Sequence, residues 1–294
     1  MKDMYIPSKV LEQRILHILA DDIGHGDITT ALIVPQRSMA EAEVITKEGG
    51  VVAGIEEAKI LLESLGLKAQ MMITDGEYVN PKQRLMRISG NARAILSAER
   101  TLLNLVSRMS GIATATWKLV RKVEKTKSKT KIACTRKTAP GMLYFDKKAV
   151  QIGGGDTHRL HLDDMILIKE NHVVIAGSLK KAIERAIKKA SFSKKIEVEV
   201  TEPEDAVVAA KAGADLVMLD NFSPEKIRKA VGMLKKAGFY GKVLLEASGG
   251  ITSENISNFV NTGVDIVSLG EVTDSVRAMD MSLEITKATQ KLVR

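Results

Sequence analysis

A repeated unit in the second half of the chain most constrains what this sequence can fold into. From about residue 160, a short apolar run is followed by a segment with the hydrophobic period of a helix, and the pattern then starts again. The apolar runs are Met165–Ile168, Ile196–Val200, Leu216–Leu219, Val243–Leu245 and Ile266–Leu269. The amphipathic segments are Leu179–Ala190, Glu204–Ala212, Glu225–Ala237 and Glu254–Asn261. This alternation predicts parallel strands joined by right-handed crossovers.

The residues that end each apolar run help to choose between two architectures. A barrel and an open doubly wound sheet both fit the repeat itself. The runs end in polar or small residues, among them Lys169, Glu199, Asp220, Ser248 and Gly270. A barrel gathers the carboxyl ends of its strands into one mouth, where barrel enzymes keep their chemistry, whereas an open sheet spreads them along a line. We therefore expect a barrel-like domain with its site at that mouth.

The first hundred residues follow a different pattern, which predicts a separate α+β module. The strand-like segments are Met39–Lys47, Gln70–Ile73 and Leu85–Ile88, and the helix-like segment is Ile55–Leu65. Ser97 is expected to cap a long helix that runs through Met109. The expected domains are a first domain at 1–110, which the C-terminal residues 276–294 join, and a barrel at 111–275.

The chain is basic, with 44 Lys and Arg against 36 Asp and Glu and a formal net charge of +8. Such an excess suits nucleic acid, an anionic membrane surface or anionic small substrates. Aromatic residues make up only 3% of the chain, although a surface that binds single-stranded nucleic acid is typically rich in them. Much of the lysine lies in runs typical of solvated helix faces and loops. The charge alone does not decide among the three.

Several features favour a cytoplasmic protein. Cys134 is the only cysteine, so an intrachain disulfide cannot form. The sequence has no run of about 18 apolar residues that would predict a membrane span. The first 14 residues carry charges throughout and have no apolar core of a signal peptide.

Cationic motifs carry the chemistry expected at the mouth. The motifs are Thr135–Gly141, Gly153–Arg159 and Ile168–His172, and their charged or titratable side chains are Arg136, Lys137, His158, Arg159 and Lys169. Each of these side chains alone could be a surface charge. If they converge, the site must bind a polyanion, because uncompensated buried cations are costly.

Two further groups of residues extend this site. Ser248-Gly249-Gly250 precedes an expected helix start and resembles a phosphate cradle, with backbone amides aimed at oxygens. Glu199 and Asp220 either cap the helices that follow them or, beside phosphates, hold Mg²⁺ through water. The histidines could instead suggest zinc, but their spacing is generic and no cysteine accompanies them.

In their order along the chain, these motifs resemble those of the quinolinate phosphoribosyltransferases, also called nicotinate-nucleotide pyrophosphorylases (carboxylating). The resemblance runs nearly end to end, and the ordered set is far more specific than any one motif. The matching segments are Asp21–Thr30, Ala98–Asn104, Ser110–Thr114, Thr135–Gly141, Gly153–Arg159, Ile168–His172, Glu197–Val200, Leu219–Phe222, Glu246–Ile251 and Ser268–Gly270. A related molybdenum-associated family shares parts of the Thr-Arg-Lys-Thr motif, but the full cation set favours the quinolinate family.

The resemblance implies an α/β fold with an N-terminal α/β sandwich domain and a C-terminal open, incomplete TIM-like α/β barrel. It implies a decarboxylating pentosyltransferase that converts quinolinate and phosphoribosyl pyrophosphate to nicotinate mononucleotide, CO₂ and pyrophosphate, for NAD biosynthesis. Mg²⁺ is the implied cofactor. The implied assembly is a homodimer with shared active sites, or a higher oligomer, with no nucleic-acid or membrane partner. The alternative is transfer to nicotinate or another small anionic base.

The resemblance also implies a role for each matching residue. Arg100, donated by the second subunit, would surround the two quinolinate carboxylates together with Arg136, His158, Arg159 and Lys169. The residues expected to face the ribose, the pyrophosphate and Mg²⁺ are Lys137, Glu199 and Asp220. Those expected to cradle the 5′-phosphate are Ser248, Gly249, Gly250, Ser268, Leu269 and Gly270. Thr135 is counted among the substrate-binding residues, and the catalytic set is Lys137, Lys169, Glu199 and Asp220.

The sequence departs from the family pattern at two places. Glu271 and Asp274 stand where the family commonly has Ala and His, and Phe145–Lys148 is unusual around an expected Lys-Tyr pair. Both places are expected near substrate, so they bear on substrate preference.

Overall fold

The computed structural model describes residues 6–289, which form two compact units. The first unit contains the chain up to Ala115, residues 151–153 and the segment from Val276 onward. The second contains Thr116–Val150 and Gly154–Ser275. Residues 1–5 and 290–294, the outer ends of the predicted first domain, lie outside the described residues. Within the described part, no helix has both the length and the apolar character needed to span a membrane.

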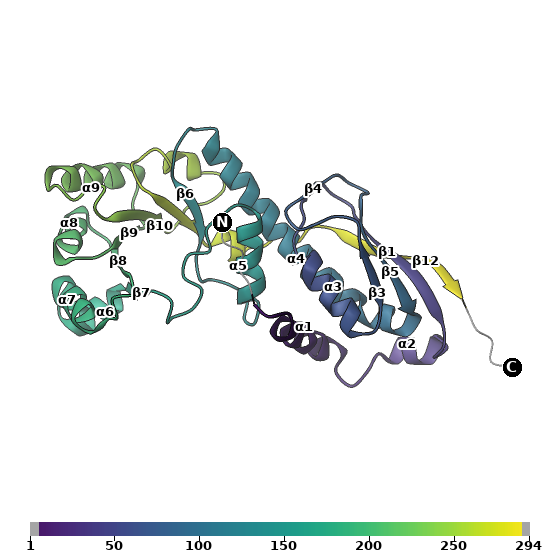
Figure 1. Ribbon diagram of the computed structural model, residues 1–294. Coiled ribbons are helices and arrows are strands. Elements are labelled where there is room, and N and C mark those ends of the chain that lie inside the picture. The colour runs from purple at the N-terminus through teal and green to yellow at the C-terminus, as the bar shows by residue number, and fades with distance from the viewer. Residues whose placement is uncertain (1–5, 290–294) are drawn as a thin grey trace. The chain divides into compact units, whose positions relative to one another are not determined.

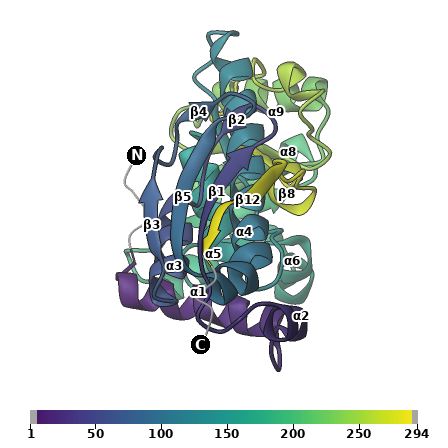
Figure 2. The same cartoon turned by 90° about the vertical axis from the view of Figure 1, so that its right-hand side faces the viewer.

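The first unit is built on an antiparallel four-stranded sheet in the order β12-β1-β5-β3. Figure 2 shows these strands side by side, and the helices α3 and α4 lie on one face of the sheet (Figure 1). The strands of the unit are β1 (Met39–Thr46), β2 (Gly50–Val51), β3 (Lys68–Met71), β4 (Tyr78–Val79), β5 (Arg84–Asn91) and β12 (Met281–Thr289). Its helices are α1 (Ser8–Ile23), α2 (Ile28–Ile33), α3 (Ile55–Ser64) and the first part of α4 (Ala92–Glu124). Because β12 pairs with β1 from Met281 to Thr289, the C-terminal segment completes this sheet.

Helix α4 begins at Ala92, so the prediction that Ser97 caps it is wrong. The side chain of Asn91 takes that role, since its Oδ1 accepts the backbone N–H groups of Arg93 and Ala94 at 2.9 and 3.3 Å. Ser97 lies inside the helix, and its hydroxyl donates to Asp27 at 3.0 Å. Residues 89–91 have the composition of a turn, and for this reason the sequence did not identify Asn91 as the cap.

The motif Ser110–Thr114 is explained by close packing within the first unit. The hydroxyls of Ser110 and Thr114 accept the backbone N–H groups of Ala53 and Val51 at 3.0 and 2.9 Å. Between them, a Cβ on Gly111 would lie only 2.2 Å from the carbonyl oxygen of Arg277. Glycine is therefore required for the backbone of α4 to approach this segment. These residues serve the fold of the first unit.

The second unit contains a parallel six-stranded sheet in the order β6-β11-β10-β9-β8-β7. The strands are β6 (Lys131–Cys134), β7 (Ile166–Ile168), β8 (Ile196–Val200), β9 (Leu216–Asp220), β10 (Leu244–Ser248) and β11 (Ile266–Leu269). Neighbours in the sheet follow the chain order from β7 to β11, and β6 then pairs with β11. This is the strand order of a barrel with a seam between β6 and β7. The predicted open, incomplete barrel is confirmed.

The helices of the second unit lie between its strands, and α7, α8 and α9 cover one face of the sheet (Figure 1). They are the last part of α4 from Thr116 onward, α5 (Leu143–Ile152) except for its last two residues, α6 (Glu170–Ala176), α7 (Leu179–Lys189), α8 (Pro203–Ala212), α9 (Pro224–Lys236), η1 (Ile256–Asn258) and α10 (Glu271–Asp274). The helix predicted at 254–261 is wrong, because only the single 3₁₀ turn η1 forms there. The side chains of Thr252 and Asn255 each accept the other's backbone N–H, and this local turn competes with a helix.

Candidate active site

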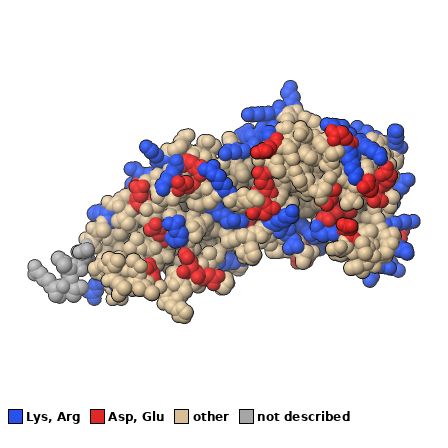
Figure 3. Space-filling model, turned by 180° about the vertical axis from the view of Figure 1, so that it is seen from behind, with Lys and Arg blue, Asp and Glu red and all other residues tan. Residues whose placement is uncertain are grey.

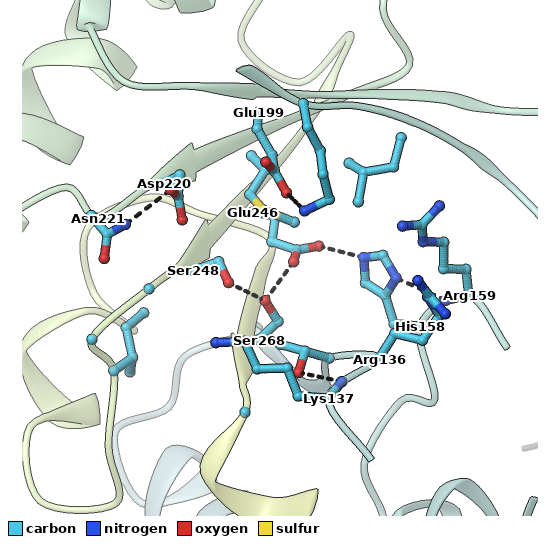
Figure 4. A pocket seen from close by; sticks show the side chains of 18 residues that line it. Arg136, Lys137, His158, Arg159, Glu199, Asp220, Asn221, Glu246, Ser248 and Ser268 are labelled. Carbon is cyan, nitrogen blue, oxygen red and sulfur yellow. Dashed lines mark hydrogen bonds and ion pairs between the residues drawn. The ribbon is translucent and has the colours of Figure 1, made fainter. Parts of the chain in front are cut away.

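A cavity of about 470 Å³ lies in the second unit at the carboxyl ends of the parallel strands (Figure 4). It brings together thirteen of the fifteen predicted site residues: Thr135, Arg136, Lys137, His158, Arg159, Lys169, Glu199, Asp220, Ser248, Gly249, Gly250, Ser268 and Gly270. Five further residues line it: Leu167, Met218, Asn221, Glu246 and Ile251. The predicted location at the strand ends is therefore where the structure places these side chains.

Strand register explains why these side chains face one cavity. Met218 of β9 pairs with Glu199 on one side and with Glu246 on the other. Two residues further along β9, Asp220 pairs with Ser248. Side chains alternate between the two faces of a strand, so residues two apart point the same way. The same-face positions of three neighbouring strands thus supply three carboxylates of the cavity and the hydroxyl of Ser248.

The cationic residues gather mainly on one side of the cavity. In Figure 4, His158, Arg159 and Arg136 lie opposite Asp220. The side chain of Arg159 is buried. Burial, and after it the charge of Arg136, lowers the pKa of Arg159. An anionic ligand would relieve this repulsion, so this side of the cavity is suited to a carboxylate or phosphate.

A glycine turn follows β10 and forms the opposite part of the lining. Gly249 and Gly250 have positive φ values of 85° and 62°. A Cβ on Gly249 would lie 2.3 Å from the side-chain oxygen of Asn221, so no other residue fits there without displacing Asn221. The amide of Asn255 donates to the carbonyl of Gly250 at 2.9 Å and fixes the turn. The two glycines leave the backbone of this turn uncovered by side chains, as the close approach of a phosphate would require.

Two carboxylates face the cavity with partners from the protein. Lys169 Nζ lies 2.5 Å from Glu199 Oε1, and Asn221 donates to Asp220 Oδ2 at 2.9 Å. Carboxylate oxygens that border a water-accessible cavity fit Mg²⁺, which keeps several waters. Another group with metal-ligand spacing, His158 with Glu197 and Glu246, is almost enclosed and includes a nitrogen ligand, which suits Mg²⁺ less well. Among the residues that line this cavity, Glu199 and Asp220 therefore fit the predicted ion best.

Sequence reasoning missed the buried carboxylates of Glu197 and Glu246 as site residues. Both are fully buried, and His158 Nε2 lies 3.3 Å from Glu197 Oε2 and 3.1 Å from Glu246 Oε2. Burial lowers the pKa of His158, but these two carboxylates outweigh it and raise the pKa above its usual value. The backbone N–H of Arg159 points at Nδ1 from 2.8 Å and opposes a second ring proton there, so the geometry assigns a neutral ring with its hydrogen on Nε2. Burial raises the pKa of Glu197. The two carboxylates thus approach the same ring nitrogen of His158 from the buried side of the cavity. The sequence signal that could have identified Glu197 and Glu246 is a charged residue at an inward-facing position of a largely apolar strand.

A buried lysine was also missed. Lys147 of α5 is fully buried and donates to the carbonyl oxygens of Thr135 and Thr157, at 2.9 and 2.5 Å. Thr135 precedes Arg136, and Thr157 precedes His158, so one ammonium group ties together the two loops that carry the cations. The unusual segment Phe145–Lys148 thus includes a residue that shapes the cavity.

Two predicted residues do not line the cavity. Leu269 is buried, in the strand β11. Arg100 is exposed on α4 and belongs to the first unit, whereas the cavity belongs to the second. Its predicted contribution from a second subunit stays a prediction.

The residues that depart from the family pattern lie beside the predicted phosphate loops. Glu271 accepts the backbone N–H and the hydroxyl of Ser253, at 2.7 and 3.0 Å. A Cβ on Gly270 would lie 2.5 Å from Asp274 Oδ2. Glu271 therefore fixes the segment that follows the glycine turn, and Asp274 places a carboxylate next to Gly270.

The surface charge outside the cavity is mixed. Figure 3 shows acidic side chains interspersed among the basic ones on the face it presents. Many lysines lie close to carboxylates, as in the pairs Lys226–Glu202 and Lys229–Glu204. Such exposed pairs are typical of solvated surfaces. The concentration of cations in the cavity is therefore the more informative feature of this basic chain.

The barrel-like unit, the cationic cavity at its strand ends and the glycine turn define a protein that binds small, multiply charged anions. Comparisons with known proteins agree with this class. Residues 27–110 match the model of the quinolinate phosphoribosyl transferase N-terminal domain, and residues 112–284 match that of the C-terminal domain.

Proteins of this kind are known from archaea to animals. The "probable nicotinate-nucleotide pyrophosphorylase [carboxylating]" of Methanothermobacter thermautotrophicus is 43% identical over 92% of this chain and 97% of its own. The human nicotinate-nucleotide pyrophosphorylase [carboxylating] is 36% identical over 87% of this chain and 85% of its own. The solved structure of the enzyme from Francisella tularensis has a TM-score of 0.87 and 39% identity, covering 97% of this chain and all of that one. The chain belongs to the quinolinate phosphoribosyl transferase family.

Proposed function

We propose that the chain transfers the phosphoribosyl group of phosphoribosyl pyrophosphate to quinolinate and yields nicotinate mononucleotide, CO₂ and pyrophosphate. The observation that carries this proposal is the single cavity that combines a cationic side with a glycine turn suited to phosphate, in a chain of this family. Both substrates are polyanions, and the cavity offers each of them a matching region. The same chemistry makes the chain an enzyme of pyridine nucleotide biosynthesis.

The reaction needs alignment and charge neutralisation more than a protein nucleophile. The pyridine nitrogen forms a bond to C1 of the ribose while the C1–oxygen bond breaks, and pyrophosphate leaves with the electron pair. The bond to the 2-carboxylate then breaks, CO₂ departs, and the ring carbon takes up a proton. The ring nitrogen, cationic after transfer, stabilises the electrons left by that carboxylate. Holding the two anionic reactants in line supplies much of the rate enhancement.

The proposed roles follow the two sides of the cavity. Arg136 and Arg159 bind the quinolinate carboxylates, because a guanidinium can hold a carboxylate through two parallel hydrogen bonds. His158 lies beside them, and Lys169 contributes after it leaves Glu199. Lys137, with Thr135 nearby, faces the pyrophosphate. The phosphate cradle consists of Ser248, Gly249, Gly250, Ser268 and Gly270.

Mg²⁺ is the proposed cofactor, held by Glu199 and Asp220 through water. The ion would supply positive charge against the pyrophosphate. The two carboxylates themselves would accept hydrogen bonds from the ribose hydroxyls, which orients the sugar between the two sides of the cavity.

The proposed assembly is a homodimer, or a higher oligomer, in which Arg100 of one subunit contributes to the cavity of the other. The support is the exposure of Arg100 on α4 and the matching motif around it. A cytoplasmic location is also proposed, and the lone cysteine is consistent with it.

One experiment tests the proposed reaction. The protein is incubated with phosphoribosyl pyrophosphate, Mg²⁺ and either quinolinate or nicotinate. We expect nicotinate mononucleotide and an equal amount of CO₂ from quinolinate only. Product from nicotinate without CO₂ release would instead support the alternative of transfer to a monocarboxylate, and no product from either would refute both.

A further inference from the structure

A chain of hydrogen bonds joins the two sides of the cavity through residues of its lining. At one end, the backbone N–H of Arg159 donates to His158 Nδ1 at 2.8 Å. The other ring nitrogen of His158, Nε2, lies 3.1 Å from Glu246 Oε2. The second oxygen of Glu246 accepts the hydroxyl of Ser268 at 2.5 Å, and the hydroxyls of Ser268 and Ser248 are 2.9 Å apart. Figure 4 shows this sequence of contacts, with Glu246 at its centre.

The donors and acceptors available set the direction of each bond in this chain. Because Nδ1 of His158 accepts the N–H of Arg159, the ring must carry its hydrogen on Nε2, and this hydrogen points to Glu246. A serine hydroxyl has one hydrogen, so Ser268 donates to Glu246 and receives from Ser248. Both oxygens of Glu246 therefore act as acceptors, one from each side of the cavity.

The geometry of His158 shows that it is held in place by these bonds. Its φ of +52° lies in the left-handed region, which a non-glycine residue adopts at a cost that its surroundings must offset. Both of its ring nitrogens already have partners within the protein. Both nitrogens of the imidazole therefore take part in hydrogen bonds that fix the backbone turn from which the Arg159 side chain extends.

We infer that Glu246 is a positioning residue that acts through His158 on Arg159 and through Ser268 on the phosphate cradle, and so couples the two substrate regions. In this inference, which rests on the proposed function, His158 orients Arg159 and does not bind quinolinate itself. Glu246 is central because one of its oxygens contacts His158 and the other contacts Ser268, so it joins both branches. Loss of its charge would then weaken the binding of both substrates, although Glu246 itself need not touch either reacting atom.

The test compares two isosteric substitutions on neighbouring buried carboxylates. Glutamine at position 246 has one acceptor oxygen and one amide, so either His158 or Ser268 would meet an N–H where it now meets an oxygen. We expect Glu246→Gln to weaken quinolinate binding by about 10- to 100-fold, as loss of a hydrogen bond to a buried charged group does. Phosphoribosyl pyrophosphate binding should weaken in the same variant, and kcat at saturating substrate should fall less than kcat/KM.

Glu197→Gln is the matched control. Glu197 is equally buried and its Oε2 lies 3.3 Å from the same nitrogen, slightly farther than Glu246, but among the described residues it makes no hydrogen bond to the serine branch. We therefore expect a smaller loss of affinity, of about threefold or less. Calorimetric titration with each substrate measures both variants, and thermal unfolding shows whether they remain folded. Equal losses in the two variants, or an unchanged Glu246→Gln, would overturn the inference.

A second measurement does not depend on the reaction. In protein labelled with ¹⁵N-histidine, the imidazole signals of His158, assigned by their loss in His158→Asn, report which nitrogen carries hydrogen. We expect Nε2 to be protonated and Nδ1 to be an acceptor in the wild type. A protonated Nδ1 would break the link to Arg159 and overturn the inference. If the wild type makes no product, the proposed function fails, whereas the imidazole spectrum still decides the hydrogen-bond chain.

Discussion

Replacing Gly249 by alanine should damage the phosphate region without unfolding the protein. Two effects add at this position. The φ of +85° is unfavourable for alanine, which costs roughly 1–2 kcal/mol. In addition, the new Cβ would lie 2.3 Å from the side-chain oxygen and 2.9 Å from the backbone nitrogen of Asn221, so Asn221 must move. Since Asn221 donates to Asp220, the displacement reaches a carboxylate of the cavity.

Gly238→Ala separates these two effects. Gly238 also has a positive φ, of 76°, but a Cβ there would meet nothing within 4 Å, and Gly238 does not line the cavity. Both variants should lose about 1–2 kcal/mol in the free energy of unfolding from backbone strain. Only Gly249→Ala should also lose affinity for phosphoribosyl pyrophosphate, by at least about tenfold, which corresponds to 1.4 kcal/mol.

The assays are urea unfolding for stability and calorimetric titration for binding. If Gly249→Ala binds phosphoribosyl pyrophosphate as the wild type does, the glycine turn is not the phosphate cradle. If Gly238→Ala weakens binding equally, general loosening of the second unit explains the effect better than the clash with Asn221.

Three other predictions follow from the cavity. Arg136→Ala and Arg159→Ala should each weaken quinolinate binding by about 10- to 150-fold, the cost of one charge-assisted pair, and unchanged titrations of both would remove them from the site. Glu199→Gln combined with Asp220→Asn should abolish turnover while harming quinolinate binding less, and full activity at ordinary Mg²⁺ would contradict the metal assignment. When Arg100→Ala chains are mixed with chains of that double variant, up to about half of the sites in mixed dimers should regain activity, because one site carries both lesions and the other neither. Verified exchange without recovery would show that Arg100 does not act across the interface.

The parts of the fold that could be predicted are those with a periodic signal. The runs that became β8 and β9 were predicted to within one residue. β9 is a continuous apolar run, as strands buried on both faces are, and in β8 apolar residues alternate with two glutamates. The segment at 254–261 failed because its structure depends on side-chain bonds between Thr252 and Asn255. Such bonds leave no trace in hydrophobic period. Where the hydrophobic period did not distinguish a helix from a turn, side-chain hydrogen bonds determined the local structure.

The site residues that lie at strand ends could be predicted from the sequence. Those that lie within the buried strands could not. Lys169 directly follows the end of β7 and Arg136 lies two residues past the end of β6, so their place at the mouth follows from the topology. Glu197 and Glu246 lie within the strands themselves, among apolar neighbours. Their role depends on which loop residue packs against them, and His158 reaches them from a distant part of the sequence. A single sequence does not specify such a long-range contact.

The pairing of opposite charges explains how a cavity so rich in cations can exist before substrate binds. Lys169 is paired with Glu199 at 2.5 Å, and the charges of Glu197, Glu199 and Asp164 favour the charged form of Arg159. Unpaired cations in this position would be costly, so these carboxylates stabilise the folded protein in the absence of ligand. An arriving carboxylate or phosphate must then compete with them, which lowers its net affinity. In the proposed reaction, quinolinate takes Lys169 from Glu199, and this exchange releases the Glu199 carboxylate for the ribose and Mg²⁺. Binding of the first substrate would in this way prepare the site for the second.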